Sequence, residues 1–220
     1  MQPGMITESD VLEAVKKYRV IVACRKVPEN RFSDTVRALY EGGIRLLEVT
    51  FDQSSPTAVP DTQKCIGLAR DLELPGLLVG AGTVLTAEQV EAARRAGAQY
   101  ILAPNTSARV IESSRASHLA VFPGAFTPSE ITEAYSLGAT CIKVFPANSL
   151  GPAYIKAIRS PISHIPMIAM GGVNAENMQS YLDAGVIGVG VGSNLVNLKK
   201  INENDFKAIT KLAKEYTIQF

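Results

Sequence analysis

The chain has 220 residues, of which 46% are hydrophobic and 20% are charged, proportions that indicate a folded globular protein and exclude a disordered one. Its 22 basic and 21 acidic residues nearly cancel to a formal charge of +1, which argues against nucleic acid or an anionic membrane as a partner. No apolar run approaches the roughly 18 residues of a membrane span, and the first residues lack the apolar core of a signal peptide.

Three cysteines without CxxC spacing indicate reduced thiols rather than a disulfide framework, so we expect a cytoplasmic protein. No linker rich in proline or serine divides the chain, and its composition does not shift along its length. We therefore expect a single domain over residues 1–220.

The first predicted element is an amphipathic helix at 6–18, which opens with Thr7 and has Asp10 three residues later, as a helix cap requires. A continuous β-branched run at 19–24 then indicates a strand that is covered on both faces. From there, apolar runs and helical stretches alternate. The predicted strands are 45–51, 77–81, 99–103, 119–122, a lysine-containing strand within 138–147, 167–170 and 186–191, and the predicted helices are 34–41, 57–72, 87–96, 107–114, 128–137, 152–158, 175–184 and 205–216.

Eight strands, each followed by a helix, predict an α/β fold of the (β/α)₈ TIM-barrel type with an additional N-terminal helix. The rival is a doubly wound open sheet, whose glycine-rich phosphate fingerprint would follow the first strand. The residues there are Arg25 to Pro28 and include no glycine. The barrel is therefore favoured.

Glu48 and Lys143 are the two ionisable residues that lie inside otherwise apolar strands. Strand alternation places Glu48 on one face with Thr50, and Lys143 on one face with Phe145. If both faces point into the barrel, the carboxylate and the amine can meet across it. A buried salt bridge is one interpretation, and the functional one is a Schiff-base lysine beside a carboxylate that moves protons.

Glycines gather where the last two strands end, at Gly171, Gly172 and Gly192, and Ser193 follows them. Barrels commonly bind phosphate here through backbone N–H groups, aided by the N-terminus of a following helix, so we expect a phosphate or carboxylate site. Arg25 and Thr83, at the ends of the first and third strands, are further candidates to hold an anion.

Both histidines lie away from the predicted site, His118 at a strand start and His164 in the loop before the seventh strand. Neither belongs to a metal-binding spacing, so we predict chemistry without a metal or other cofactor.

The motifs at 47–50 (LEVT), 80–85 (GAGTVL) and 143–147 (KVFPA), with the glycine pair at 171–172 and Gly-Ser at 192–193, come in a characteristic order. In this, the chain resembles the class I 2-keto-3-deoxy-6-phosphogluconate/4-hydroxy-2-oxoglutarate (KDPG/KHG) aldolases over nearly its whole length. The resemblance implies a metal-free homotrimeric barrel that cleaves a small 2-keto-4-hydroxy acid to pyruvate and an aldehyde.

The same resemblance implies a role for each motif. Lys143 would form the imine with the substrate ketone, and Glu48 would shuttle protons. The other implied substrate-binding residues hold the carboxylate end, shape the pocket or bind a distal phosphate, and they are Arg25, Thr50, Thr83, Phe145, Pro146, Gly171, Gly172, Gly192 and Ser193.

Two positions depart from the family pattern. Asp52 stands where phosphogluconate-type members often have arginine, and Met170 stands where they tend to have threonine. Asp52 cannot make the charge-assisted contact of an arginine, and Met170 lacks the hydroxyl of a threonine. We therefore expect weaker binding of a doubly anionic sugar acid unless another group compensates. The substrate is therefore left open among 2-keto-3-deoxy acids.

Two other functions remain as alternatives. One is a phosphosugar epimerase or decarboxylase in which Lys143 acts as a charged electrophile, although such enzymes usually need several acidic or metal-binding groups. The other is a non-catalytic barrel that only binds phosphorylated ligands.

Overall fold

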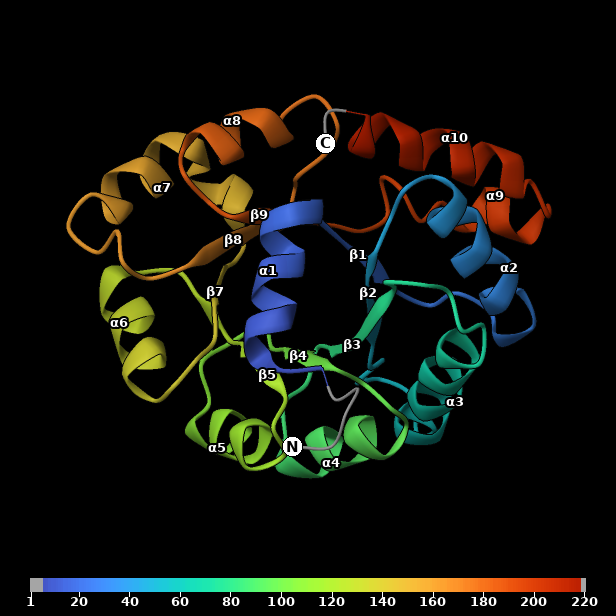
Figure 1. Cartoon of the computed structure of the whole chain (residues 1–220), viewed down its shortest axis with the longest axis horizontal. Helices are drawn as coiled ribbons and strands as arrows, with labels where there is room; N and C mark the ends of the chain where they lie inside the picture. The colour runs from blue at the N-terminus through green and yellow to red at the C-terminus, as the bar shows by residue number, and fades with distance from the viewer. Residues whose placement is uncertain (1–5, 219–220) are drawn as a thin grey trace.

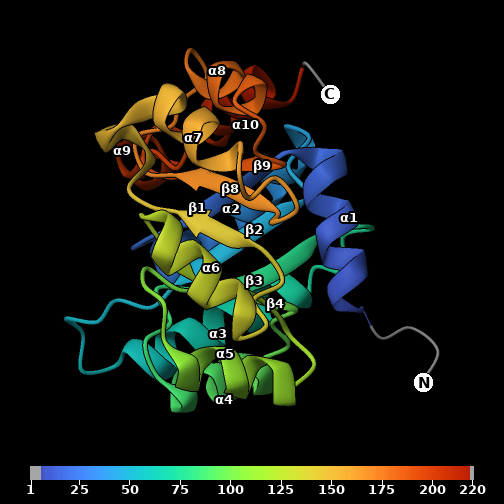
Figure 2. The ribbon, with the colours of Figure 1, turned by 90° about the vertical axis from the view of Figure 1, so that its left-hand side faces the viewer.

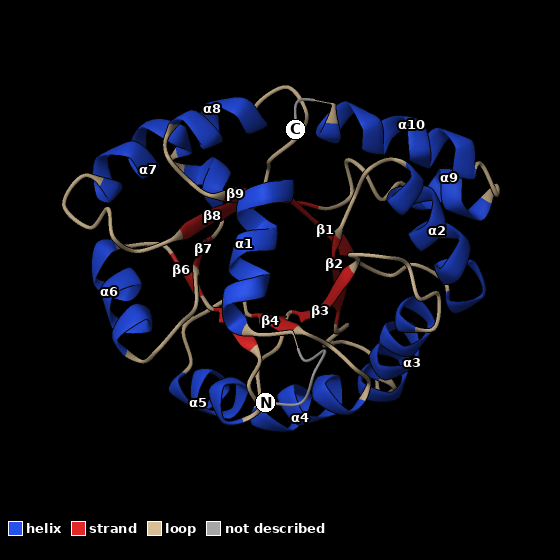
Figure 3. Ribbon diagram, viewed as in Figure 1, coloured by secondary structure: helices blue, strands red, loops and turns tan. Residues whose placement is uncertain are grey.

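Nine parallel strand segments form one sheet that curves into a barrel (Figures 1 and 3). The computed structural model describes residues 6–218. Around the barrel the order is β5-β4-β3-β2-β1-β9-β8-β7-β6. The segments are β1 (Val20–Cys24), β2 (Leu46–Thr50), β3 (Leu78–Gly82), β4 (Tyr100–Leu102), β5 (Ala120–Phe122), β6 (Gly124–Ala125), β7 (Ile142–Val144), β8 (Met167–Met170) and β9 (Gly188–Val191).

The segments β5 and β6 occupy one strand position that is interrupted at Pro123. The first pairs with β4 and the second with β7. Across the interruption, Lys143 N donates a hydrogen bond to the Pro123 carbonyl at 2.9 Å. Eight strand positions therefore surround the barrel, which confirms the predicted (β/α)₈ class.

Helices surround the barrel and alternate with its strands (Figure 2). Within residues 6–218, no helix has both the length and the apolar character needed to cross a membrane. The helices after β1 are α2 (Glu29–Glu41), α3 (Ala58–Arg70), α4 (Ala87–Arg95), α5 (Ala108–Ala116), α6 (Pro128–Ser136), the 3₁₀ turn η1 (Ala147–Ser149), α7 (Gly151–Arg159), α8 (Met178–Asp183), α9 (Leu198–Asn202) and α10 (Phe206–Thr217).

Two predicted helix starts need correction, and one further helix was not predicted. Helix α2 begins at Glu29, five residues before the predicted start at 34, because Pro28 precedes it with the fixed φ of −58° that suits a helix entrance. Helix α8 begins at Met178 rather than at 175. The short α9 was not predicted, and the Asn197 side chain caps it by accepting from Lys200 N.

Strand alternation divides the hydrophobic core into two layers. Outward-facing side chains such as Val22 and Leu47 pack against the helices, whereas inward-facing ones such as Ile21, Leu46 and Tyr100 fill the barrel. Because every second residue of a strand faces inward, a polar residue at such a position has its side chain in the barrel interior.

Helix α1 (Glu8–Tyr18) lies across one end of the barrel (Figures 1 and 3). Thr7 and Asp10 form the predicted capping box at its start, and Val11 and Val15 are buried in the inner layer of the core. Because α1 covers the N-terminal ends of the strands, the C-terminal ends are where a ligand can enter.

Candidate active site

Lys143 of β7 and Glu48 of β2 are the only buried charged side chains in the described part of the chain, with 4% and 1% exposure. Their strands are separated by β1, β9 and β8, so they occupy opposite positions in a ring of eight. Both residues alternate with inward-facing neighbours, namely Leu46 on β2 and Cys141 before β7. The two side chains therefore approach each other across the barrel, as the alternation predicted.

Burial shifts both groups toward their neutral forms. Desolvation lowers the pKa of the Lys143 amine; the Glu48 carboxylate opposes this shift, and Arg25 adds to it. Desolvation likewise raises the pKa of the Glu48 carboxyl, against the fields of Lys143 and Arg25. No carboxylate among residues 6–218 lies within 4.0 Å of Lys143 Nζ, and Glu48 Oε2 is buried without a hydrogen-bond partner. A simple buried salt bridge does not describe this pair.

Glycines on β3 make room for the carboxylate. A Cβ on Gly82 would overlap Glu48 Oε1, and a Cβ on Gly80 would overlap the Tyr100 ring. The Tyr100 hydroxyl donates to the Leu47 carbonyl at 2.6 Å, so this ring is fixed as part of the floor below the site. This steric role was not predictable from the sequence, because it depends on which side chains lie over the neighbouring strand.

A cavity of about 530 Å³ opens at the C-terminal ends of the strands and has Lys143 in its wall. Seven of the predicted substrate-binding residues line it, namely Arg25, Thr83, Phe145, Gly171, Gly172, Gly192 and Ser193. Lys26, Val173 and Asn194 also line it, and the sequence analysis assigned them no part in the site.

Arg25 and Thr83 lie together at this cavity. The Arg25 guanidinium donates from Nη2 to Thr83 Oγ1 at 3.3 Å, and Thr83 has a left-handed backbone with φ of 57°. A positive φ is unfavourable for a β-branched residue and is concentrated at functional sites. The pair thus presents a cation and a hydroxyl, which suits an oxyanion.

The glycine loops form a second polar wall. Gly171 and Gly172 have φ of 95° and 74°, and a side chain on Gly172 would overlap Asn148. Asn194 Nδ2 donates to the Val173 carbonyl at 3.3 Å and joins the two loops. Within residues 6–218, the backbone N–H groups of Gly172, Ser193 and Asn194 donate no hydrogen bond, so they are available to an anion.

The helix after β9 begins some residues beyond the glycines, although its first residue, Leu198, lines the cavity. The residues after Gly192 form a turn in which Leu195 N and Val196 N both donate to the Gly192 carbonyl at 2.9 Å, and α9 begins only at Leu198. The free N–H groups nearest to the glycines therefore belong to the loops.

Two predicted substrate-binding residues do not line the cavity, and neither does the predicted catalytic Glu48. Thr50 Oγ1 donates to the Cys24 carbonyl at 3.3 Å and so stabilises the ends of two strands. Pro146 packs against Gly171, where an added Cβ would lie 3.1 Å from the proline Cα. Both positions are structural supports of the site.

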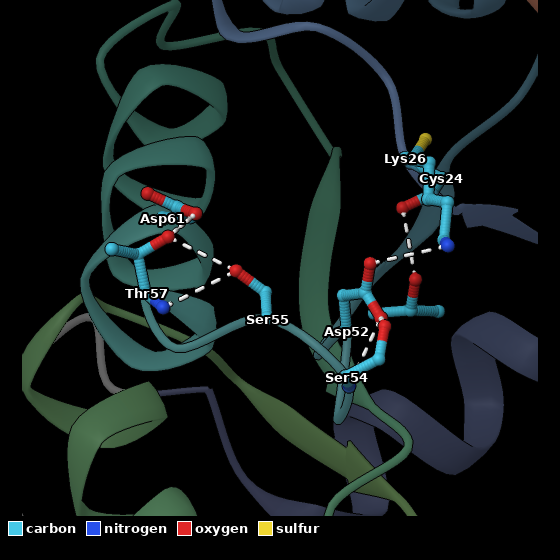
Figure 4. A network of polar contacts seen from close by, with 8 residues as sticks. Cys24, Lys26, Asp52, Ser54, Ser55, Thr57 and Asp61 are labelled. Atoms are coloured by element: carbon cyan, nitrogen blue, oxygen red, sulfur yellow. Dashed lines mark hydrogen bonds and ion pairs between the residues drawn. The ribbon is translucent and has the colours of Figure 1, made fainter.

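A second cavity of about 470 Å³ lies beside the first, between the ends of β1 and β2 and the helices α2 and α3. Its polar lining, part of which is drawn in Figure 4, includes Lys26 and Asp52, which form an ion pair at 3.3 Å. In the described residues, no group of three or more His, Cys, Asp or Glu side chains is arranged to hold a metal ion.

Comparison with known proteins gives the family. The sequence model of the family described as "KDPG and KHG aldolase" matches residues 11–212. The chain belongs to the KDPG and KHG aldolase family. It is 33% identical over 201 residues to the 2-dehydro-3-deoxy-6-phosphogalactonate aldolase of Escherichia coli, covering 91% of this chain and 95% of that protein.

Other family members give the same picture. The chain is 34% identical to a 2-dehydro-3-deoxy-phosphogluconate aldolase of Treponema pallidum, over 93% of this chain and 95% of that one. The crystal structure of the Legionella pneumophila KDPG aldolase, "with pyruvate captured at low pH as a covalent carbinolamine intermediate", superposes with a TM-score of 0.84 at 28% identity, over 96% of this chain and 98% of that one. Proteins of the KDPG and KHG aldolase family are lyases, so this chain is an enzyme.

Proposed function

We propose that the protein is a Schiff-base aldolase that cleaves a 2-keto-3-deoxy sugar acid, with or without a 6-phosphate, or 4-hydroxy-2-oxoglutarate. The products are pyruvate and an aldehyde, which is glyceraldehyde 3-phosphate from a 6-phosphorylated sugar acid, glyceraldehyde from an unphosphorylated one, and glyoxylate from 4-hydroxy-2-oxoglutarate. The observation that carries this proposal is the isolated pair of buried charged groups, Lys143 and Glu48, in a barrel with one open end. An amine that burial shifts toward neutrality is a nucleophile for a ketone.

In the first stage, the neutral Lys143 amine attacks the C2 carbonyl of the substrate. The resulting carbinolamine loses water to give a protonated imine, and the protonated Glu48 carboxyl supplies the proton that the departing hydroxide needs. The raised pKa of Glu48 favours this acidic form. The Phe145 ring, whose centroid lies 4.9 Å from Lys143 Nζ, stabilises positive charge on the nitrogen.

In the second stage, the C3–C4 bond breaks. The Glu48 carboxylate accepts the proton of the C4 hydroxyl, the aldehyde leaves, and the bonding electrons move into the imine to give an enamine on Lys143. Protonation of the enamine at C3 and hydrolysis of the imine then release pyruvate and restore the amine. A carboxyl group that changes state twice in one cycle needs a pKa near neutrality, which burial favours.

The mouth of the cavity supplies the groups for the substrate's anionic ends. We assign the substrate carboxylate to Thr83 and Arg25, which are joined by a hydrogen bond, and a distal phosphate to the glycine loops with Ser193. The relatives are named for both phosphogluconate and phosphogalactonate substrates, so C4 stereochemistry is a separate question.

The epimerase or decarboxylase alternative has less support. Such chemistry usually needs several acidic groups or a metal, whereas Glu48 is the single buried carboxylate of the described chain. A barrel that only binds ligands would have no use for a buried amine without an ion-pair partner, because such a group costs stability.

We also propose a homotrimer, as the family resemblance implies, and a cytoplasmic location, as the three cysteines without CxxC spacing indicate. All three cysteines are free, and burial raises the pKa of Cys65 to about 11 and of Cys24 to about 12, which keeps both thiols protonated.

The decisive experiment traps the imine. Wild-type protein incubated with pyruvate and borohydride should gain the mass of one reduced pyruvate adduct, and peptide mapping should place it on Lys143. Lys143→Ala should gain none, and Glu48→Gln should form the adduct more slowly and lose about 10² to 10⁴-fold in cleavage rate. A wild-type protein that stays unlabelled while a control Schiff-base aldolase is labelled would refute the proposal.

A further inference from the structure

Lys26 lies between the two cavities at the C-terminal end of the barrel. Strand alternation on β1 would turn residue 26 outward, like Cys24, yet Lys26 lines both the outer cavity and the one that contains Lys143. Its backbone is left-handed, with φ of 56°, and this reversal just after β1 places the residue at the shared rim. Lysine is seldom found in this conformation, which is tolerated where the surroundings require it.

Asp52 holds the Lys26 ammonium at this rim. Lys26 Nζ lies 3.3 Å from Asp52 Oδ2, while Asp52 Oδ1 accepts from Ser54 Oγ at 2.6 Å and from Ser54 N at 3.2 Å (Figure 4). These two bonds from Ser54, and then Lys26, lower the pKa of the Asp52 carboxyl, so it is ionised at neutral pH. Asp52 is therefore a fixed anion that orients a mobile cation.

The loop that carries Asp52 is itself anchored to the catalytic cavity. Gln53 Nε2 donates to the Thr83 carbonyl at 2.6 Å, and the Gln89 side chain donates to Gln53 Oε1 at 2.9 Å. The ion pair is thus fixed relative to Thr83, which lines the cavity.

The pair is exposed, and this allows it to rearrange. The side chains of Lys26 and Asp52 are 58% and 36% exposed, and ion pairs in such surroundings contribute little to stability. A lysine has a flexible four-carbon stem, so its ammonium can turn to a new anion while its backbone stays in place.

We infer that Lys26 binds an oxyanion of the substrate, and that Asp52 is a positioning residue that holds the ammonium at the rim of the cavity until substrate arrives. This inference rests on the proposed aldolase function. Asp52 stands where phosphogluconate-type members often have arginine. The ammonium of Lys26 neutralises this carboxylate and supplies a cation in place of that arginine. The oxyanion is either the carboxylate next to the ketone or a group at the distal end.

Steady-state kinetics of Lys26→Met test the inference. We expect KM for 2-keto-3-deoxy-6-phosphogluconate to rise by about tenfold, because a charge-assisted contact is lost, with kcat nearly unchanged because Lys26 does not touch the reacting atoms. Lys26→Arg should retain most of the affinity. The matched control is Lys64→Met, which removes another exposed lysine, paired with Glu29 at 2.8 Å, that does not line the catalytic cavity.

A second variant tests the part played by Asp52. In Lys26→Met, Asp52 is an unneutralised anion near the substrate, so adding Asp52→Asn should recover part of the lost affinity. If the double variant recovers none, Asp52 does not repel the substrate. The positioning role is tested by Asp52→Asn alone, which should raise KM while Lys26 is present, and an unchanged KM would refute that role. If Lys26→Met and Lys64→Met have the same KM as wild type, the role assigned to Lys26 is wrong.

Two further measurements identify the oxyanion. If Lys26 binds the carboxylate, the pyruvate concentration that gives half-maximal trapping on Lys143 should also rise in Lys26→Met. If it binds the distal group, trapping by pyruvate should be unchanged, and the unphosphorylated sugar acid should show a smaller rise in KM. The wild-type trapping reaction tests the proposed aldolase function separately from the role of Lys26. If the wild-type protein forms the adduct but Lys26→Met has no effect, only the role of Lys26 is refuted.

Discussion

Burial shifts the pKa of the Lys143 amine and the pKa of the Glu48 carboxyl in opposite directions. Burial disfavours the charged form of each, so it lowers the pKa of the amine and raises that of the carboxyl. Each group also opposes the other's shift through its charge. A pair built in this way can exchange protons without either partner being locked into an ion pair.

The pH dependence of trapping tests this arrangement. Imine formation needs the neutral amine, and the neutral fraction rises with pH through the folded pKa of Lys143. Because that pKa is lowered, the trapping rate should reach its plateau below the ordinary titration range of lysine, near 10.5. Cyanoborohydride trapping with pyruvate, followed by mass spectrometry across a pH series, measures the inflection.

Two substitutions should move this inflection in opposite directions. Glu48→Gln removes a charge that raises the pKa of Lys143, so the inflection should move to lower pH, and Arg25→Met removes a charge that lowers it, so the inflection should move to higher pH. Lys64→Met serves as the control and should leave it in place. Shifts of the same sign in both variants would contradict the electrostatic account.

At the residue scale, the sequence alone predicted Lys143 and Glu48 as the candidate pair, because an ionisable residue within an apolar strand is conspicuous, and the structure buries both side chains. Lys26 was not identifiable, since an exposed loop lysine ordinarily indicates only a solvated charge. Its significance depends on Asp52, which is distant in sequence and is brought to it only by the pairing of β1 with β2. Thr50 has an inward position by alternation, yet its hydroxyl is used by the Cys24 carbonyl.

At the scale of elements, strand β3 leaves room for the side chains of its neighbours, because its glycines have no side chains of their own. Gly82→Ala would place a methyl group against the Glu48 carboxyl, and since Gly82 does not have a left-handed φ, the effect should be steric. We expect kcat to fall by about 10²-fold, as a displacement of about 1 Å can cause. Gly67→Ala on α3, where an added Cβ meets no atom within 4 Å, is the control and should leave kcat unchanged. Circular dichroism should show both variants folded.

Helix α1 contributes stability at the end of the barrel opposite the cavity. Val15 is fully buried against the inner core, so Val15→Ala should lower the free energy of unfolding by about 2 kcal/mol through lost burial and a small cavity. Urea unfolding measures this, with Val59→Ala, at a position 37% exposed, as a control that should change it by less than about 0.5 kcal/mol. An unchanged KM is expected for both, and a large rise in Val15→Ala would mean that α1 acts on the site.

Element types were more predictable than their ends. The long apolar or periodic runs identified every strand position and the principal helices. The early start of α2 was missed because its first turn is polar apart from Phe32, and the interruption at Pro123 depends on how one strand divides its pairing between β4 and β7.

At the scale of the whole molecule, the order of the strands makes the site. Glu48 and Lys143 are far apart in sequence, and only a closed ring of eight strand positions places them opposite one another. The repeated alternation of strand and helix predicted this closure. The loop geometry at the glycine wall was not predictable, because the turn at Gly192 is fixed by local backbone hydrogen bonds rather than by periodicity.

Assembly is the remaining property of the whole molecule. The proposed trimer predicts a mass of about three times the 23.5 kDa of the chain in size-exclusion chromatography with light scattering. A mass that stays at one or two chains at micromolar concentration would refute a stable trimer. Catalytic activity measured on the same fractions would show which species carries it.

The position of α1 also has a kinetic consequence. With the N-terminal end of the barrel covered, substrate and both products use one passage past Arg25 and Thr83. In the proposed mechanism, the aldehyde is freed when the carbon bond breaks, whereas pyruvate remains covalently attached until hydrolysis. Release is therefore ordered, with pyruvate last. Pyruvate should inhibit cleavage competitively, and the aldehyde should inhibit it noncompetitively.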